Sequence, residues 1–354
     1  MSHLVTLGIS HKTAPVQLRE RLALTQEEMP RFLHEVAGHG DVRESVAIST
    51  CNRTEVTVVV GDPVAGEAEV LGVLAQRAQV RPTELAESIY APRNCDAARQ
   101  LFRVTAGLES MIVGEAEIQG QVKRAYEEAL SAGTTGALTN RLFTAALQAG
   151  KRVRSETAIG EGRASISSVA VDLAQDLLGD LARRHVVIVG AGETSELTAH
   201  ALAERGVHTM FVANRHADRA RALAERFGGK VVALDALPAQ LQQADIVVAS
   251  TASPHPLLVP EDLEEIMRAR RGRPLLLIDL AVPRDVDPGC DDVPGVTLYD
   301  VDDLQAVVEQ TVSVRAAEAL RAEAIVEEEI SRFAEWMGSM AVLPTIRALR
   351  DHGD

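Results

Sequence analysis

The sequence predicts an α/β protein in three parts, which are two α/β domains and a long helical segment at the C-terminal end. Short strands alternate with helical patterns over the first 155 residues. From about residue 165, strand–helix units with continuous apolar strands repeat, a pattern typical of a doubly wound parallel sheet covered by helices on both faces. Over residues 303–336, apolar positions recur at helical spacing through a charged stretch without glycine.

The first part is predicted to span residues 1–155. The expected strands are 3–9, 44–49 and 54–60, and the expected helices are 17–24, 27–36, 71–78 and 97–104. Thr25 has a side chain suited to cap the second of these helices. A long helical stretch is expected over 107–156, interrupted by the glycine-containing turn 133–136.

The second part is predicted to span residues 156–300, and the third residues 301–354. In the second, strands are expected over 186–189, 209–213, 230–233, 246–249 and 274–280, with helices over 168–178, 196–205 and 217–227. The third part is expected to form one helix from about Asp303 to Trp336, long enough to need a second helix or another subunit to pack on. Pro344 is expected to begin a short final helix.

The composition favours a cytoplasmic protein without a membrane span. No apolar run reaches the length of a bilayer crossing, and the N-terminus lacks the regions of a secretion signal. The three cysteines, Cys51, Cys95 and Cys290, are scattered, which favours free thiols and argues against a zinc site, so no metal is expected. The net charge of −15 is opposite in sign to that of most nucleic-acid binders, so any RNA contact needs a local basic patch.

One candidate for such a patch lies in the helical stretch before residue 156. Its basic residues include Lys123, Arg124, Arg141, Lys151, Arg152 and Arg154. They form either an ordinary solvated helix face or a positive strip that faces phosphate, and the sequence leaves both interpretations open.

Cys51 is the candidate nucleophile. An isolated cysteine is more often a buried structural thiol. Here Arg53 supplies a fixed cation that favours the thiolate, and Thr50, Asn52 and Thr54 can hydrogen-bond a polar substrate. Together with a nucleotide-binding motif in the other half of the chain, this suggests a two-stage reaction in which the thiolate captures an acyl group and a reduced nicotinamide then reduces the thioester.

The nucleotide-binding motif is a glycine turn that follows a buried strand and opens a helix. Its first glycine permits the tight turn, its second admits a pyrophosphate, and the helix N-terminus faces the anion. At the end of the next strand, where an NAD site usually has an acidic residue, Arg215 would attract a 2′-phosphate, which predicts NADPH as the cofactor. Ser195 stands where the third glycine usually lies, and a glycine turn without a ligand is the alternative. The candidate cofactor-binding residues are Gly190, Ala191, Gly192, Glu193, Thr194, Ser195, Asn214 and Arg215. Two later runs, 250–253 and 279–285, either line the same crevice or serve packing.

With both sites in place, the sequence resembles the glutamyl-tRNA reductase family over nearly its whole length. The resemblance rests on separate blocks in the family's order, which are GISHKTAP at 8–15, STCNRTE at 49–55, GLESMIVGE at 107–115, QGQVK at 119–123, the turn 190–195, Asn214-Arg215 and AVPR at 281–284. Several unlinked blocks are far more specific than any single one.

The resemblance implies the first step of tetrapyrrole (porphyrin) biosynthesis. Cys51 would attack the ester carbonyl of glutamyl-tRNA(Glu), the tRNA would leave a thioester behind, and NADPH would release glutamate-1-semialdehyde. The implied substrate contacts are Thr50, Asn52, Arg53, Ser110, Glu115, Ala116, Glu117 and Gln121. Arg53 suits the glutamate carboxylate and Glu115 the ammonium group. The resemblance also implies a homodimer, a hinge near residues 155–165, and glutamate-1-semialdehyde aminomutase as a partner.

The chain departs from the family pattern at two places. Gln100 occupies the catalytic position of the family's histidine in a His-Leu-Phe run, where the histidine is thought to assist proton transfer. Glutamine forms hydrogen bonds but does not shuttle a proton near neutral pH. The chain also stops at Asp354, before the usual end of the family, so a shortened, truncated dimerisation segment is expected.

Two other functions stay open. A shikimate-dehydrogenase-like NADP enzyme would share Asn214, Arg215 and the turn 250–253, but it would have no use for Cys51 beside Arg53. A non-catalytic or altered paralogue that binds tRNA or a pathway partner would explain Gln100. Replacing Cys51 by serine separates these classes, because only an enzyme that uses the thiol loses turnover while it keeps binding.

Overall fold

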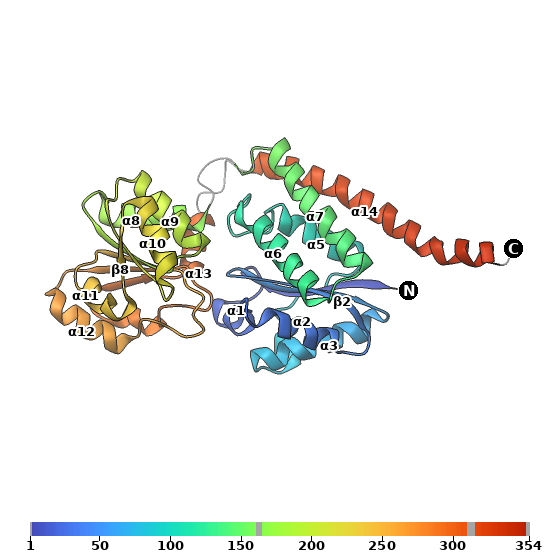
Figure 1. The fold of residues 1–354 in the computed structure, drawn as a ribbon, viewed down its shortest axis with the longest axis horizontal. Helices are drawn as coiled ribbons and strands as arrows, with labels where there is room; N and C mark the ends of the chain where they lie inside the picture. The colour runs from blue at the N-terminus through green and yellow to red at the C-terminus, as the bar shows by residue number, and fades with distance from the viewer. Residues whose placement is uncertain (1, 161–164, 310–315, 352–354) are drawn as a thin grey trace. The chain divides into compact units, whose positions relative to one another are not determined.

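The computed structural model describes residues 2–160, 165–309 and 316–351. It confirms the predicted class, a mixed α/β protein with a parallel-sheet domain and a helical C-terminal region (Figure 1). The expected hinge near 155–165 includes residues 161–164, which lie outside the described part of the chain.

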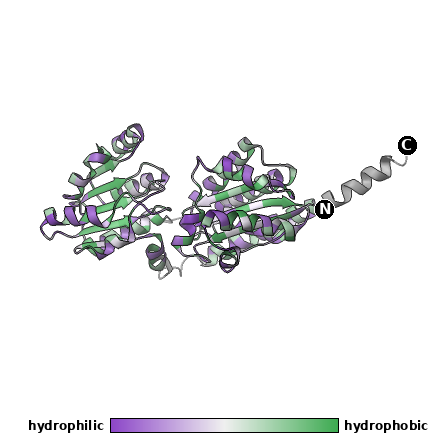
Figure 2. Cartoon of the chain, turned by 90° about the horizontal axis from the view of Figure 1, so that it is seen from below, coloured by the Kyte–Doolittle hydropathy of each residue, from purple (hydrophilic) through white to green (hydrophobic). Residues whose placement is uncertain are grey.

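The chain divides into two compact units. The first contains residues 1–14, 21–162 and 312–354, and the second contains residues 15–20 and 163–311. Strands of both sheets are coloured mostly as hydrophobic in Figure 2, and the helices around them carry the hydrophilic residues.

The first unit is built on a three-stranded antiparallel sheet. Its strands are β1 (His3–Ser10), β2 (Val42–Thr50) and β3 (Arg53–Val60), in the order β1-β3-β2. Every residue of the central strand β3 is buried, because helices pack against both of its neighbours and against β3 itself. All three strands were predicted from their alternating or β-branched patterns, and each extends slightly further than expected.

Helices cover this sheet. They are α2 (Met29–Ala37), α3 (Pro63–Ala78), α4 (Pro82–Leu85), α5 (Cys95–Thr105), α6 (Glu117–Ala132), α7 (Ala137–Glu156) and α14 (Ala316–Asp351), while the residues of α1 (Val16–Leu22) are divided between the two units.

The helical stretch expected over 107–156 is wrong at its start. Residues 106–116 form turns and bends, because Gly107 and Gly114 adopt φ angles of 78° and 88°. A Cβ atom on Gly114 would lie 2.0 Å from the carbonyl oxygen of Ile159, so only glycine fits there. The rest of the stretch forms α6 and α7, and Gly133 ends α6 in the left-handed conformation.

The prediction that Thr25 caps the second helix is wrong, because Thr25 does not directly precede a helix. Helix α2 begins at Met29 and its N-cap residue is Glu28, which makes no side-chain cap. Thr25 instead bonds to Glu28. The Glu28 Oε2 atom accepts from the Thr25 backbone N–H at 3.0 Å and from its hydroxyl at 2.9 Å. The pair therefore holds the turn that leads into the helix.

The second unit is a six-stranded parallel sheet in the order β6-β5-β4-β7-β8-β9. Its strands are β4 (His185–Val189), β5 (Thr209–Ala213), β6 (Lys230–Val232), β7 (Ile246–Ala249), β8 (Leu275–Asp279) and β9 (Val296–Tyr299). Its helices are α8 (Ile166–Leu178), α9 (Glu193–Glu204), α10 (Ala217–Phe227), η1 (Leu234–Ala236), α11 (Leu237–Leu241), α12 (Pro260–Arg270), η2 (Pro288–Asp292) and α13 (Val301–Glu309). This order confirms the predicted doubly wound sheet, in which the strands are added to one side up to β6 and to the other side from β7 onward, so that the switch point lies between β4 and β7. Sequence patterns missed α12 and β9. Strand β9 gave a weak signal, because it is short and only its first residue is buried.

A short N-terminal segment belongs to this second unit. Arg19, which is 2% exposed, pairs with Asp302, and the backbone N–H of Val16 donates to the same carboxylate at 3.2 Å. The Glu20 carboxylate accepts from the guanidinium of Arg284 at 2.8 Å. Arg284, in the run 279–285, is therefore used in packing.

Helix α14 packs on α5 and α7 of the first unit. The rings of Phe102 and Phe333 lie 5.9 Å apart, and Arg99 pairs with Glu327 at 2.9 Å. The single helix expected from Asp303 to Trp336 includes residues 310–315, outside the described residues, with α13 before them and α14 after. Pro344 does not begin a new helix, because α14 continues through it to Asp351. Among the helices that the structure describes, none combines the length and apolar content needed to cross a bilayer.

Candidate active site and nucleotide-binding site

Cys51 lies in the two-residue turn of the hairpin that joins β2 to β3. Thr50 pairs with Arg53, which leaves Cys51 and Asn52 in the turn. Neither adopts a positive φ, unlike residues of the common two-residue hairpin turns. Hydrogen bonds hold the turn instead, from the His11 N–H to the Asn52 carbonyl at 2.8 Å and from the Asn52 N–H to the Thr50 hydroxyl at 3.2 Å. Cys51 is half-buried, two residues before the fully buried strand β3.

Strand β3 carries a buried charge cluster next to this turn. The side chains of Arg53 and Glu55 are each 1% exposed and form an ion pair of 2.7 Å. The same Glu55 oxygen accepts from the Tyr90 hydroxyl at 2.6 Å and from the Gln100 amide at 3.0 Å. Burial, and then the charge of Glu55, raises the pKa of Tyr90 well above its usual value, so Tyr90 remains a donor. Gly8 makes room, because a Cβ atom there would lie 2.7 Å from Glu55 Cγ.

Sequence reasoning missed Glu55 and Tyr90. A signal for Glu55 existed, since residues two apart on a strand share a face and Arg53 was already singled out. Tyr90 lies in a segment without a predicted element and gave no signal. The expected carboxylate partner of Arg53 was a substrate, whereas the structure places Glu55 there. The guanidinium also donates to the carbonyl of Glu109, and its Nε has no hydrogen-bond partner among the described residues.

Ser110 lies in the loop 106–116, which Arg53 attaches to β3 through Glu109. The Glu109 carboxylate pairs with Lys12 at 2.6 Å and Arg103 at 2.7 Å. The Ser110 hydroxyl is buried without a hydrogen-bond partner in the described structure, and so is the side-chain oxygen of Asn52. Because buried polar atoms are nearly always hydrogen-bonded, these two atoms indicate a place for a polar ligand.

Thr50 and Gln121 line one cavity of about 280 Å³ between the sheet and α6. The same cavity is lined by Ser49, Arg124 and Glu128. Burial raises the pKa of Glu128 above its usual value. An arginine and a carboxylate beside Thr50 could face the two charged ends of an amino acid. The sequence alone indicates Arg124 only as one of several basic residues, and it gives no signal for Glu128.

The other predicted contacts at the start of α6 lie elsewhere. Ala116 is the N-cap residue and Glu117 the first residue of the helix. Ala116 is exposed and lines a different cavity, between α6 and α7. Glu115 is half-buried in the loop before it.

The predicted nucleotide turn joins β4 to α9. Gly190 adopts a φ of 122°, and a Cβ atom there would lie 2.7 Å from the carbonyl oxygen of Ser250, so this position requires glycine. Gly192 is the N-cap residue of α9, is exposed, and has open space where a Cβ atom would lie. An anion can therefore approach the backbone N–H groups of the first helical turn, which Glu193 and Thr194 begin. Ala191 is half-buried between the two glycines.

Ser195 and Arg215 have contrasting environments. Ser195 is fully buried and its hydroxyl bonds to the Ser250 hydroxyl at 2.7 Å, so it joins α9 to the end of β7. Asn214 accepts from the His216 backbone N–H at 3.3 Å just after β5. Arg215 is exposed and forms no ion pair with any described residue. Its guanidinium is available to an anionic group beside the turn.

Buried carboxylates lie at the carboxyl ends of β7 and β8. Asp279 accepts from the backbone N–H groups of Ala281 at 3.0 Å and Val286 at 2.8 Å. Asp285 accepts from the backbone and hydroxyl of Thr251 at 2.6 and 2.5 Å. Burial raises the pKa of Asp279 to about 7 and raises that of Asp285. These contacts show that the run 279–285 shapes the sheet edge.

We expect Asp279 to make folding stability depend on pH. The folded state retains a proton that the unfolded state releases near pH 4, so the stability associated with this group is lost as pH rises from about 4 to about 7. The whole interval is worth at most on the order of 4 kcal/mol. Thermal denaturation of the wild type and of Asp279→Asn between about pH 5 and pH 8 measures the difference. Parallel curves for the two proteins would contradict this expectation.

The other two cysteines differ from Cys51 in exposure. Cys290 is fully buried, and burial raises the pKa of its thiol to about 12, so it is not a nucleophile. Cys95 is exposed at the start of α5. Among the described residues, no group of three or more His, Cys, Asp or Glu side chains could hold a metal ion.

Comparison with known proteins gives consecutive family matches. Residues 7–157 match the N-terminal domain of glutamyl-tRNA(Glu) reductase, residues 172–307 match shikimate/quinate 5-dehydrogenase, and residues 321–354 match the dimerisation domain of glutamyl-tRNA(Glu) reductase. A glutamyl-tRNA reductase from Geobacter metallireducens is 43% identical over 98% of this chain and 80% of its own length. One from Syntrophotalea carbinolica is also 43% identical, over 98% of this chain and 78% of its own. The solved glutamyl-tRNA reductase from Methanopyrus kandleri is 39% identical with a TM-score of 0.51, covering 95% of this chain and 81% of that one.

Proposed function

The chain belongs to the glutamyl-tRNA reductase family, and from this membership we propose that it reduces glutamyl-tRNA(Glu) to glutamate-1-semialdehyde with NADPH, the first step of tetrapyrrole synthesis from glutamate. The observation that carries the proposal is Cys51, a half-buried thiol in the hairpin turn, together with the buried polar atoms of Asn52 and Ser110 that have no hydrogen-bond partner among the described residues.

The proposed chemistry uses the Cys51 thiolate as nucleophile. Its sulfur bonds to the carbonyl carbon of the glutamyl ester, the bond from that carbon to the 3′ ribose oxygen breaks, and the tRNA leaves with a protonated hydroxyl. NADPH, when bound, would supply a hydride to the carbonyl carbon of the thioester. Breaking of the carbon–sulfur bond would then leave the aldehyde and return the Cys51 thiolate to its starting state. An ester or thioester is activated toward this reduction, whereas a free carboxylate is not.

The substrate contacts proposed from the family are Thr50, Asn52, Arg53, Ser110, Glu115, Ala116, Glu117 and Gln121. Thr50 and Gln121 share a cavity, which supports their assignment. The pairing of Arg53 with Glu55 supports an indirect role, in which Arg53 holds the loop of Ser110 and offers only its Nε to a ligand.

Gln100 is proposed as a positioning residue. Its amide donates to the Glu55 oxygen that also binds Arg53 and Tyr90. Glutamine can keep this hydrogen bond without carrying a proton, so general acid–base assistance must come from water or another group.

The nucleotide turn fits a dinucleotide, because Gly190 permits the tight turn against Ser250 and Gly192 leaves open space at the N-terminus of α9. Gly190 to Thr194 would hold the pyrophosphate, and Asn214 and Arg215 the 2′-phosphate of NADPH. The buried hydroxyl of Ser195 supports a structural role for this residue, with its backbone N–H left for the cofactor.

Replacing Arg215 by alanine is expected to raise the KM for NADPH by about 10- to 100-fold and to leave the KM for NADH unchanged, because a charged hydrogen bond to the 2′-phosphate is lost. Steady-state kinetics with both cofactors measures this. Arg183→Ala is the matched control, because Arg183 is an exposed arginine just before the amino end of β4, whereas Arg215 follows the carboxyl end of β5. Equal loss with NADH would argue for a role other than phosphate recognition.

The assembly and organisation follow the family in the same way. The match of residues 321–354 to a dimerisation domain supports a homodimer. We further propose glutamate-1-semialdehyde aminomutase as the partner that receives the aldehyde, and a division into parts at 1–155, 156–300 and 301–354.

A single-turnover experiment tests the function. Protein is mixed with tRNA carrying labelled glutamate, with and without NADPH. Semialdehyde with NADPH, and an acyl-enzyme or released glutamate without it, are expected. If the ester stays intact in both arms while tRNA still binds, the non-catalytic alternative motivated by Gln100 replaces the enzyme, and Gln100→His becomes the next variant.

A further inference from the structure

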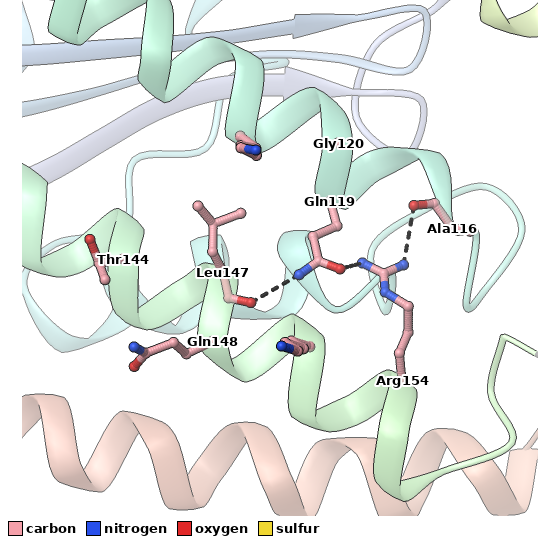
Figure 3. A pocket seen from close by; sticks show the side chains of 9 residues that line it. Ala116, Gln119, Gly120, Thr144, Leu147, Gln148 and Arg154 are labelled. Atoms are coloured by element: carbon pink, nitrogen blue, oxygen red, sulfur yellow. Dashed lines mark hydrogen bonds between the residues drawn. The ribbon is translucent and has the colours of Figure 1, made fainter.

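A second cavity lies in the first unit, between α6 and α7, with a volume of about 520 Å³ (Figure 3). Its lining combines small, apolar and uncharged polar side chains with three basic residues. The lining residues are Ala116, Gln119, Gly120, Lys123, Thr144, Leu147, Gln148, Lys151 and Arg154.

Lysine is rare in this chain, and two of its four lysines line this cavity. The sequence has four lysines, Lys12, Lys123, Lys151 and Lys230, against 32 arginines. Lys123 and Lys151 are both exposed, and come from facing helices. Lys123 has an exposed partner, Glu127, at 3.6 Å, whereas Lys151 forms no ion pair with a described residue. A lysine ammonium is a mobile point charge with three donors, suited to phosphate oxygens.

The nearby arginines Arg141 and Arg152 are used in folding, whereas Lys151 has no ion-pair partner among the described residues and Lys123 has only the exposed Glu127 at 3.6 Å. Arg152 pairs with Glu156 at 2.8 Å and with Glu328 and Glu329 of α14 at 3.2 and 2.6 Å. The guanidinium of Arg141 lies 5.7 Å from the ring centre of Trp336. These two residues of the basic strip therefore attach α14 to α7.

Arg154 shapes the cavity. It donates to the Ala116 carbonyl at 3.2 Å and to the Gln119 side-chain oxygen, and the Gln119 amide donates to the Leu147 carbonyl at 2.9 Å, as Figure 3 shows. This chain of hydrogen bonds joins α6 to α7 and holds a positive charge at one end of the cavity. Gly120 keeps the α6 side open, because Arg124 is the one described side chain within 4 Å of a Cβ atom placed there, at 3.5 Å.

The two cavities lie on different faces of the same helix. Successive residues of a helix are rotated by about 100°. Residues 116, 119, 120 and 123 therefore share one face, and residues 121, 124, 125 and 128, which line the cavity of Thr50, share another. A ligand held at one face lies one helix diameter, about 10 Å, from a ligand held at the other. This is within reach of two or three nucleotides.

We infer that the cavity between α6 and α7 binds backbone phosphates of the tRNA substrate near its 3′ end, through Lys123, Lys151 and the charge of Arg154. The inference rests on the proposed function for the identity of the RNA. In a chain with a net charge of −15, three basic side chains around one cavity, of which only Lys123 has a carboxylate partner among the described residues, supply the local patch that an RNA contact needs.

The test measures the affinity of the full-length protein for uncharged tRNA(Glu) by fluorescence anisotropy over a range of salt. The double variant Lys123→Gln/Lys151→Gln is expected to bind about 10-fold more weakly and to reduce the salt slope by about 2, since each lost phosphate contact removes about one counterion. The variant Gly120→Leu fills the cavity without a change of charge and is expected to weaken binding at least 3-fold. Lys230→Gln, on β6 in the other unit, is the charge-matched control and should bind as the wild type does.

Unchanged binding in either the lysine double variant or Gly120→Leu would overturn the inference. Inorganic phosphate, added at the same ionic strength as chloride, is expected to compete no better than chloride. Specific displacement by it would identify a small-phosphate site instead of an RNA contact.

The single-turnover assay separates this result from the proposed function. If the wild-type protein forms semialdehyde and the variants bind tRNA normally, only the inferred tRNA contact at this cavity is refuted. Wild-type protein that binds tRNA but forms no semialdehyde refutes only the reaction.

Discussion

Replacing Cys51 by alanine is expected to reduce semialdehyde formation by about 10⁴-fold or more, because no other described thiol can form the thioester. Cys290 is buried with its pKa raised to about 12, and Cys95 lies at the start of α5, on a different element from the Cys51 hairpin. The substitution removes one sulfur atom from a turn that backbone hydrogen bonds hold. Folding and tRNA affinity should therefore stay close to those of the wild type.

The measurement is single-turnover transfer of labelled glutamate to protein without NADPH, followed by semialdehyde formation with it. Cys95→Ala is the matched control and should retain full activity. Label that stays on protein in Cys51→Ala would show that a different group is the nucleophile. Loss of tRNA binding together with activity would show that Cys51 acts through structure and not through chemistry.

Replacing Glu55 by alanine is expected to lower the free energy of unfolding of the first unit by about 3–5 kcal/mol. The substitution leaves the Arg53 guanidinium buried without its carboxylate, and it also removes the acceptor of Tyr90 and Gln100. A buried charge that loses its partner costs far more than an exposed one. Glu55→Gln keeps an acceptor oxygen and should lose less.

Urea denaturation followed by far-UV circular dichroism measures these losses. Glu67→Ala is the control, since Glu67 pairs with Arg93 at 2.5 Å in the same unit, but with side chains 30% and 41% exposed. Its loss should stay within about 1 kcal/mol. The apolar double variant Arg53→Met/Glu55→Leu should recover most of the stability lost in Glu55→Ala, because both buried charges are gone. Similar losses in Glu55→Ala and Glu67→Ala would contradict the proposed importance of burial.

Local sequence patterns predicted most of the secondary structure, because the elements are short and their burial is regular. The central strands β4, β7 and β8 are mostly apolar and buried, as expected for strands covered on both faces. The alternating and then β-branched pattern over residues 54–60 marked the hairpin strand that follows Cys51. The predictions failed where tertiary contacts override the local pattern. Residues 107–116 have a helical composition, but the close approach of Gly114 to Ile159 imposes turns. Strand β9 has little apolar surface and forms because β8 offers it a partner.

By itself the sequence determined the fold class, the family, the candidate nucleophile Cys51 and the glycine turn at 190–192, since each depends on residues that are contiguous in the chain. Only the tertiary structure decided which polar groups are used by the fold and which stay available. It pairs Arg152 with acidic residues of α14 and Ser195 with Ser250, and it leaves Lys151 and Arg215 without ion-pair partners among the described residues. Partners far apart in sequence meet only when packing has set their distance, and residue spacing along the chain does not encode that distance.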